Sequence, residues 1–276
     1  MSVAAIAQQK LTECKTAMLL HCPFFASILL DMMEIKLGKF PDLFPPGNET
    51  MATNGKLIWV DEDYIAKLKL PEAVFVMSHE VGHAMFMHMS RGKFYSDAGF
   101  DGQPFNAKLW NVSGDYVIND MLIESKVGKM PKQGLHDTSK GSAGDLVDDV
   151  YRKILQNQPP PPKGKGSGKN EPGQGDADGK GHGGFDTHVL DVAKESEVEW
   201  KRAVKSAADG AKAVGKMPAG LERYVDDLLA PKVKWTEMLR SAMVKVLGRD
   251  ATNWARPNRR RLITQGVIMP SYQGYG

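Results

Sequence analysis

Residues 71–90 read PEAVFVMSHEVGHAMFMHMS, and the rest of the predicted fold is arranged around them. Pro71 suits the first turn of a helix, where its missing N–H costs nothing, and Glu72 follows it in that turn. Apolar side chains lie within and on both sides of a central His-Glu-Val-Gly-His sequence: Val74, Phe75, Val76, Val81, Ala84 and Met85. The pattern predicts a buried helix over residues 71–90.

His79 and His83 lie four residues apart, so a helix places both imidazoles on one face, within reach of a single ion. Two imidazole nitrogens at ~2.0–2.1 Å suit Zn²⁺, which needs a third protein ligand and leaves one position for water. Glu80 is close enough to act as the catalytic base that takes a proton from that water. This HExxH spacing is typical of zinc metalloproteases. Two helix histidines that only cap or pack are the alternative.

A third ligand is expected from the helix predicted over residues 107–125. In some zinc proteases the third ligand follows the HExxH motif in an extended HExxHxxGxxH sequence. That arrangement is excluded here, because Phe86 and Met89 occupy the positions of its glycine and its last histidine. Asp115 has the apolar neighbours Trp110, Val112 and Ile118, where an unpaired carboxylate would be costly and a metal would compensate it. Asp115 is therefore the predicted third ligand. A pairing of Asp115 with a lysine or arginine is the alternative, and Glu124 is the reserve ligand.

Four further residues are candidates around this site. Asn119, one turn after Asp115, could hold a ligating histidine by its second nitrogen. His88 is about 140° round the helix from His83, so we expect it to line the cleft or make a local hydrogen bond. Tyr95 and Tyr116 are candidates for stabilising the oxyanion of a tetrahedral intermediate.

The predicted fold class is α+β, mostly α, with one small hairpin or sheet. Short strands are expected within residues 51–68, with 57–60 the most strand-like run beside the turn at 53–55. Apolar residues recur at helical spacing in the remaining segments: 3–20, 24–36, 144–155, 189–214, 220–229 and 233–247. A basic stretch at 256–261 and a loose tail are expected at the end.

Residues 159–184 hold five prolines and nine glycines and no large apolar side chain. Such a composition cannot fill a core, so a flexible linker or long loop is predicted there. The expected organisation is a metallopeptidase core over 1–158, the linker over 159–184, and a helical part over 185–276 that packs on the core.

Composition narrows the class of protein. Of the 276 residues, 42% are hydrophobic and 25% are charged, as in globular proteins. The formal net charge of +3 does not point to a nucleic-acid partner. Two cysteines, Cys14 and Cys22, are too few for a disulfide framework. The longest apolar run, 17–30, is too short to span a membrane, and residues 1–10 lack the basic-then-apolar order of a signal peptide, so we expect a cytoplasmic protein.

The sequence around these motifs resembles the metallopeptidase domain that precedes a von Willebrand factor A-like (VWA-like) domain in many bacterial and phage proteins. The matching segments are HEVGH at 79–83 with His88, LWN at 109–111, GDYVIN at 114–119, NGK at 54–56, GGFD at 183–186 and WARPNRR at 254–260. The resemblance runs from the first helices to about residue 270.

This resemblance implies a zincin-like fold, in which the HExxH helix packs on a small sheet and C-terminal helices are added. It also implies intracellular partners, because relatives are often encoded beside MoxR-type AAA+ ATPases. The VWA-like domain expected next would begin with a DxSxS motif. The nearest string, DTSKG at 137–141, fails at its last position, so the VWA-like domain is expected to be absent.

Three classes of function follow. The first is a zinc-dependent endopeptidase acting on a protein or peptide, aligned antiparallel to the strand at 57–60. The second is a metal-binding scaffold in an AAA+ ATPase–VWA assembly, with little or no turnover. The third uses the basic stretch at 256–261 to contact nucleic acid, although such a run is more often solvated or docks a partner. Glu80 favours the first class, since a scaffold has no need of it.

Limited proteolysis tests the predicted organisation. The first cut is expected within residues 159–184, because that segment has no buried backbone to protect it. The fragments can be located by mass spectrometry. Resistance of this segment, with earlier cleavage inside 71–90, would contradict the layout.

Overall fold

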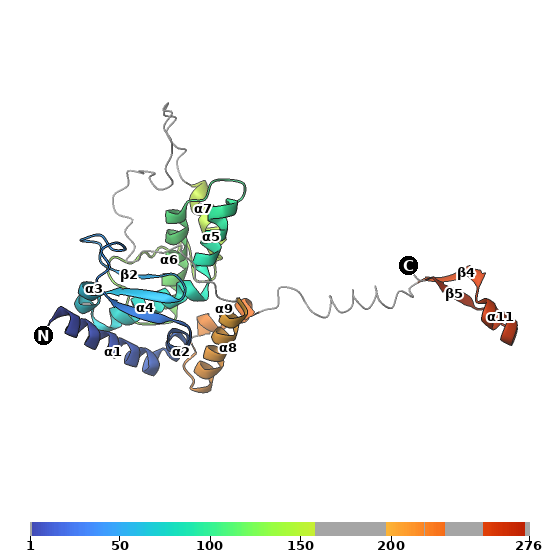
Figure 1. Ribbon diagram of the computed structural model, residues 1–276, viewed down its shortest axis with the longest axis horizontal. Coiled ribbons are helices and arrows are strands. Elements are labelled where there is room, and N and C mark those ends of the chain that lie inside the picture. The colour runs from blue at the N-terminus through green and yellow to red at the C-terminus, as the bar shows by residue number, and fades with distance from the viewer. Residues whose placement is uncertain (1, 158–196, 218, 230–250, 274–276) are drawn as a thin grey trace, which may run out of the picture. The chain divides into compact units, whose positions relative to one another are not determined.

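The computed structural model describes residues 2–157, 197–217, 219–229 and 251–273, which fall into two compact units (Figure 1). The first unit is Met1–Leu228 and the second is Leu229–Gly276. The expected linker at 159–184 and the expected helix at 233–247 lie outside the described residues, so the predicted division of the chain stays a prediction.

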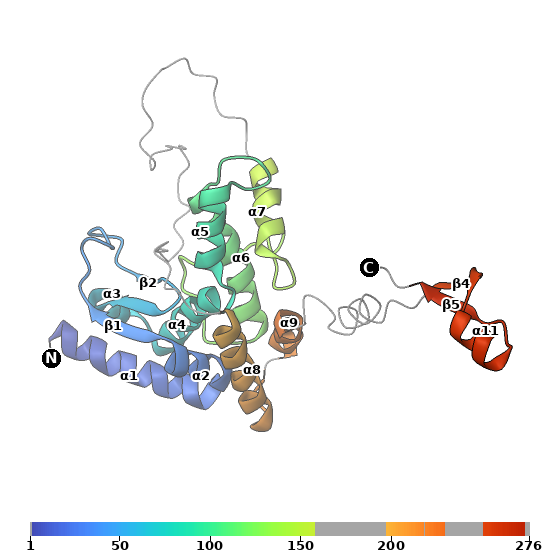
Figure 2. The same cartoon turned by 45° about the vertical axis from the view of Figure 1, so that its right-hand side comes forward.

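The first unit is mostly helical and contains one small sheet. Its elements are α1 (Val3–His21), α2 (Pro23–Met32), β1 (Glu34–Gly38), β2 (Met51–Thr53), β3 (Leu57–Asp61), α3 (Glu62–Lys67), α4 (Leu70–Met85), α5 (His88–Ala98), α6 (Ala107–Glu124), α7 (Val147–Gln156), α8 (Glu197–Ala213) and α9 (Ala219–Leu229). Figure 2 shows α5, α6 and α7 side by side, with α1 and α2 along the opposite side of the unit. The predicted class, mostly helical α+β, is confirmed.

The sheet has the strand order β1-β3-β2 and mixed direction. β1 runs parallel to β3, and β2 runs antiparallel to it. Leu57 pairs with Glu34 on one side of β3, and Val60 pairs with Met51 on the other. The expectation that residues 57–60 offer an open edge to a substrate is therefore wrong, because both edges of β3 are already paired.

Two elements near the sheet differ from the sequence prediction. The helix expected over 24–36 ends at Met32, and β1 follows it, because the backbone N–H of Glu34 bonds to the carbonyl of Lys56 across the sheet. The short helix α3 was not predicted. Asp61 begins it by accepting hydrogen bonds from the N–H groups of Asp63 and Tyr64, as an N-cap does.

The HExxH helix also ends earlier than expected. α4 stops at Met85, and Met87 adopts a left-handed conformation with φ of 53°. Such a residue ends a helix and redirects the chain, although a side chain makes it costly. The helix α5 then begins at His88, so His88 does not continue the spiral of α4. The angle of about 140° inferred for His88 on one continuous helix is therefore wrong.

α6 agrees closely with its prediction and lies against α4. Its N-cap is Asn106, whose side chain accepts a hydrogen bond from the N–H of Leu109. The two helices approach closely at a glycine: a Cβ on Gly82 would lie 2.8 Å from Cγ2 of Ile118. The absence of a side chain at Gly82 therefore sets how near α6 can come to the two histidines.

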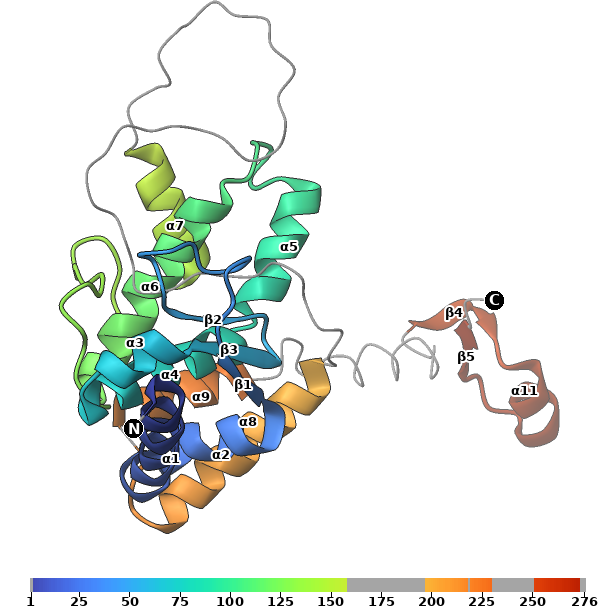
Figure 3. The same cartoon turned by 60° about the vertical axis from the view of Figure 1, so that its left-hand side comes forward.

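The C-terminal elements show one confirmed pattern and one correction. α8 lies within the segment predicted as helical over 189–214, and α9 begins one residue before the segment predicted over 220–229. α8 packs against α2 (Figure 3). In the second unit, β4 (Ala251–Pro257) and β5 (Pro270–Gln273) pair antiparallel around α11 (Arg259–Gln265). The expected loose tail is thus a strand in part. No helix among the described residues is long and apolar enough to cross a membrane.

Gly82→Ala tests the close approach of α4 and α6. Alanine favours a helix over glycine, but the added methyl meets Ile118, which is fully buried and β-branched. We expect a net loss of about 1–2 kcal/mol in the free energy of unfolding, measured by urea denaturation. Gly210→Ala in α8 is the matched control, because open space surrounds that glycine and the same change should be neutral or stabilising. Equal stabilisation by both changes would contradict the packing.

Candidate metal centre

His79 and His83 of α4 and Asp115 of α6 come together in the core of the first unit. Their ligand atoms all lie within 4.8 Å of one another. The two Nε2 atoms are 2.8 Å apart. Oδ1 of Asp115 lies 3.5 Å from Nε2 of His79 and 3.3 Å from Nε2 of His83. The structure therefore brings together the three residues that the sequence named as ligands, from two separate helices, and their role as metal ligands stays a prediction.

The triangle formed by these atoms fits a divalent ion. Ligand atoms of a tetrahedral zinc ion, with bonds of ~2.0–2.1 Å, lie about 3.3 Å apart, and the observed separations of 2.8–3.5 Å bracket that value. Two imidazole nitrogens and one carboxylate oxygen are also a donor set that zinc accepts. The residues present can therefore hold a metal ion.

Burial supports the same reading. Both histidines are 0% exposed and Asp115 is 5% exposed. A carboxylate in such surroundings needs a compensating positive charge or hydrogen bonds. Glu80, one residue after His79, is also fully buried, but its carboxyl is not among the three clustered groups. A second buried carboxylate thus lies next to His79 in the sequence.

His88 lies beside this cluster. Its ring stacks on Trp110 at a centroid distance of 4.9 Å and meets the ring of His83 edge-on at 4.8 Å. It is 1% exposed. The expected role of His88, to line a cleft or make a local hydrogen bond, stays a prediction. Its contact with His83 depends on the end of α4 before Met87, which the sequence of residues 71–90 did not indicate.

Asn119 and Asp120 fasten the loop after α6. Nδ2 of Asn119 donates to the carbonyl of Leu135 at 2.8 Å, and its buried Oδ1 accepts no hydrogen bond from the described residues. Asp120 is 2.8 Å from Nε2 of His136 and accepts from the N–H of Ala143 at 2.9 Å. The proposed support of a histidine by Asn119 stays a prediction, and the Asp120–His136 pair is one that sequence reasoning missed.

The two candidate tyrosines have partners outside the cluster. The hydroxyl of Tyr95 donates to Asp148. That of Tyr116 accepts from Nζ of Lys140 at 3.3 Å, and this bond raises the pKa of Lys140 above its ordinary value. Their predicted role at an oxyanion gains no support from these partners. The reserve ligand, Glu124, is exposed at the end of α6.

The cysteines are not candidates for metal binding. Cys14 and Cys22 are buried free thiols. Burial raises the pKa of Cys14 to about 12 and also raises that of Cys22. A thiolate is the form that binds metals and acts as a nucleophile. Because their pKa values are raised, both cysteines are neutral thiols that pack in the core near the junction of α1 and α2.

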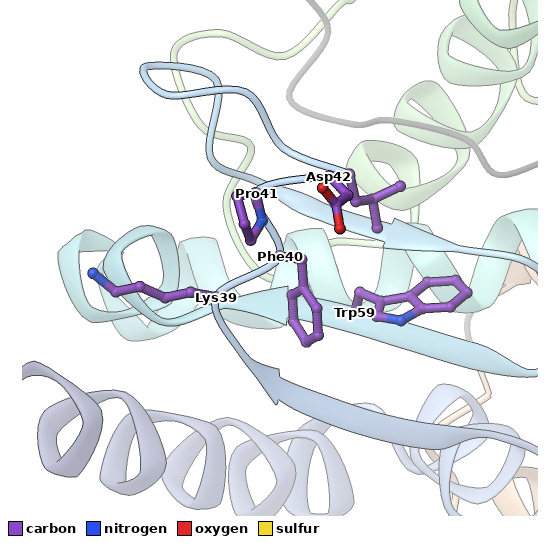
Figure 4. A pocket seen from close by; sticks show the side chains of 6 residues that line it. Lys39, Phe40, Pro41, Asp42 and Trp59 are labelled. Atoms are coloured by element: carbon purple, nitrogen blue, oxygen red, sulfur yellow. The ribbon is translucent and has the colours of Figure 1, made fainter.

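A separate cavity of about 350 Å³ opens beside the sheet (Figure 4). Trp59 of β3 and Phe40 lie next to each other there. The full lining is Lys39, Phe40, Pro41, Asp42, Leu43 and Trp59. None of these residues belongs to the metal cluster, so the cavity is distinct from the candidate centre.

Comparison with known proteins supports the assignment of the clustered residues to a metallopeptidase domain. The model of a family described as "Putative metallopeptidase domain" matches residues 7–273, a range that includes both α4 and α6. No curated protein and no solved structure matches the chain. The resemblance predicted from the HExxH segment and its neighbours is thereby confirmed over nearly the whole length. The chain belongs to this metallopeptidase domain family.

Proposed function

We propose that the protein is a zinc-dependent endopeptidase of zincin-like fold. The observation that carries this proposal is the buried triangle of His79, His83 and Asp115, with Glu80 buried beside it. The packing of β2 against α4 supports a zincin-like arrangement, in which a sheet lies beside the HExxH helix. The family match supports peptide-bond hydrolysis as the reaction class.

His79, His83 and Asp115 would hold the metal ion. When bound, zinc would supply a Lewis acid that lowers the pKa of a water molecule and polarises a carbonyl. Asp115 would add a negative charge that offsets part of the charge of the ion. The rigid helices α4 and α6 would keep the three donor atoms in place, because each ligand sits within a helix rather than on a loop.

Glu80 would act as the general base. Its carboxylate would take a proton from the attacking water and then give a proton to the leaving amine, so that the peptide bond is broken without free acid or base. A buried position suits this role, because bulk solvent does not surround the carboxylate and weaken its interaction with the attacking water. Glu80 is also the residue that a metal-binding scaffold would not require.

A metal-binding scaffold is the second candidate, and burial favours it. The side chains of His79 and His83 are 0% exposed and that of Asp115 is 7% exposed. A peptide could reach this centre only after neighbouring residues move. The scaffold would act in a cytoplasmic assembly with a MoxR-type AAA+ ATPase and a VWA-like domain, partners that are proposed from the family resemblance.

Metal analysis tests the centre directly. The purified chain should contain about one equivalent of zinc, measured by atomic emission after dialysis. His79→Ala and Asp115→Asn should each lose most of it, because each removes a ligand from a three-ligand site. His21→Ala, an exposed histidine at the end of α1, should keep the full content. A wild-type chain that binds no zinc would refute the proposal.

Glu80→Gln tests the catalytic role. Glutamine keeps the size of the side chain but cannot accept the proton, so zinc content should be unchanged while cleavage of labelled casein falls 10²–10⁴-fold. Glu199→Gln, an exposed residue of α8, is the matched control and should cleave as the wild type does.

Equal cleavage by the wild type and Glu80→Gln would show that this glutamate is not the base. If the zinc-loaded wild type cleaves nothing, alone or with its ATPase and VWA-like partners, the scaffold function is supported instead.

A further inference from the structure

The position of His88 is set by the turn between α4 and α5. α4 ends at Met85, and the left-handed conformation of Met87 starts α5 in a new direction. The carbonyl of His88 accepts a hydrogen bond from Nε1 of Trp110 at 3.0 Å. This bond fastens the first residue of α5 to α6, where Asp115 is also found.

The ring of His88 is held on two sides by α6. It stacks on Trp110, with an angle of 17° between the two planes. One turn later, Gly114 leaves the space that the ring fills: a Cβ there would lie 2.8 Å from Nδ1 of His88 and closer still to Cε1. Only a residue without a side chain at position 114 allows the ring to lie against the helix.

Trp110 is itself immobilised by neighbouring rings. Its centroid lies 5.3 Å from that of Tyr95, 5.9 Å from that of Phe105 and 5.8 Å from that of Tyr151. Trp110 and Tyr151 are 0% exposed. The surface on which His88 stacks is therefore a packed aromatic core with little freedom to shift.

The remaining side of the His88 ring faces His83. The two rings meet edge-on at 4.8 Å and 64°. His88 is not one of the three residues whose ligand atoms cluster. The ring of His83, one of the three clustered residues, is a direct neighbour of the His88 ring.

We propose that His88 is a positioning residue of the metal centre. Its ring, held between Trp110 and Gly114, blocks rotation of the His83 imidazole and keeps Nε2 of His83 directed at Asp115. The proposal rests on the function proposed above, because it takes the cluster to be a metal site. It assigns Gly114 a defined purpose, which is to make room for the ring that orients His83.

Metal affinity in a double-mutant cycle tests this role in the full-length chain. His88→Ala removes the ring and should weaken Zn²⁺ binding 10–100-fold, the range seen when residues that orient metal ligands are lost. Gly114→Ala pushes the ring towards His83 and should weaken binding at least as much. In the double variant the added methyl has no ring to displace, so its affinity should equal that of His88→Ala alone.

A spectroscopic readout separates positioning from general stability. Co²⁺ substituted for Zn²⁺ should show an altered d–d absorption in His88→Ala, because the orientation of His83 changes. Phe100→Leu is the control: it loosens the same aromatic core without a ring contact to His88 among the described residues, so it should lower thermal stability and leave metal affinity and the Co²⁺ spectrum unchanged.

The two proposals fail in distinguishable ways. A wild-type chain that binds neither ion would overturn the metal centre and this inference together. A wild type that binds zinc, with His88→Ala binding it equally well, would overturn the inference alone. The inference alone would also be overturned if Gly114→Ala weakened zinc binding equally in the presence and absence of the His88 ring. The effect of the added methyl would then arise from a change in α6 and not from displacement of the ring.

Discussion

The close contact between α4 and α6 is the constraint on which the candidate centre depends. α4 supplies two imidazole nitrogens and α6 supplies one carboxylate oxygen, so no single helix can form the triangle. Metal–ligand distances tolerate deviations of only about 0.2 Å. Gly82 and Gly114 each leave room for one side chain of the facing segment, Ile118 and His88 respectively. A side chain at Gly82 would press on Ile118 of α6, and one at Gly114 would press on the His88 ring beside His83.

The contact between α4 and α6 also buries two acidic side chains, and their burial affects both the stability of the fold and the chemistry of the site. Asp115 and Glu80 are carboxylates with almost no exposure. Placing such groups in a core costs free energy unless they are compensated, so they are poor choices for stability alone. An ion at the cluster would offset the cost for Asp115, and exclusion of water would strengthen the electrostatic effect of every group in the site. The burial of these carboxylates is thus consistent with the metal-dependent activity proposed above.

The remaining faces of α6 hold the surrounding structure in place. Trp110 and Val117 belong to an aromatic and aliphatic core shared with Tyr151 of α7. Asn119 and Asp120 bind the segment that leads from α6 towards α7, through Leu135, His136 and Ala143. A single helix thus carries a metal ligand, part of the core and the anchor of a loop. A distortion of α6 at any of these contacts would therefore shift the position of Asp115.

The sequence alone determined the features that depend on local spacing. The i, i+4 histidines, the glutamate between them and the extent of α6 follow from helical periodicity, and Asp115 follows from a carboxylate among apolar neighbours. The tertiary structure decided the rest. β1 forms only because β3 provides a partner for its backbone, which also places β3 in the centre of the sheet. The chain changes direction at Met87, and this turn brings His88 against His83. The His88 ring fits there because it stacks on Trp110 and because Gly114 has no side chain. Such features rest on contacts between residues far apart in the chain, which no local pattern in the sequence records.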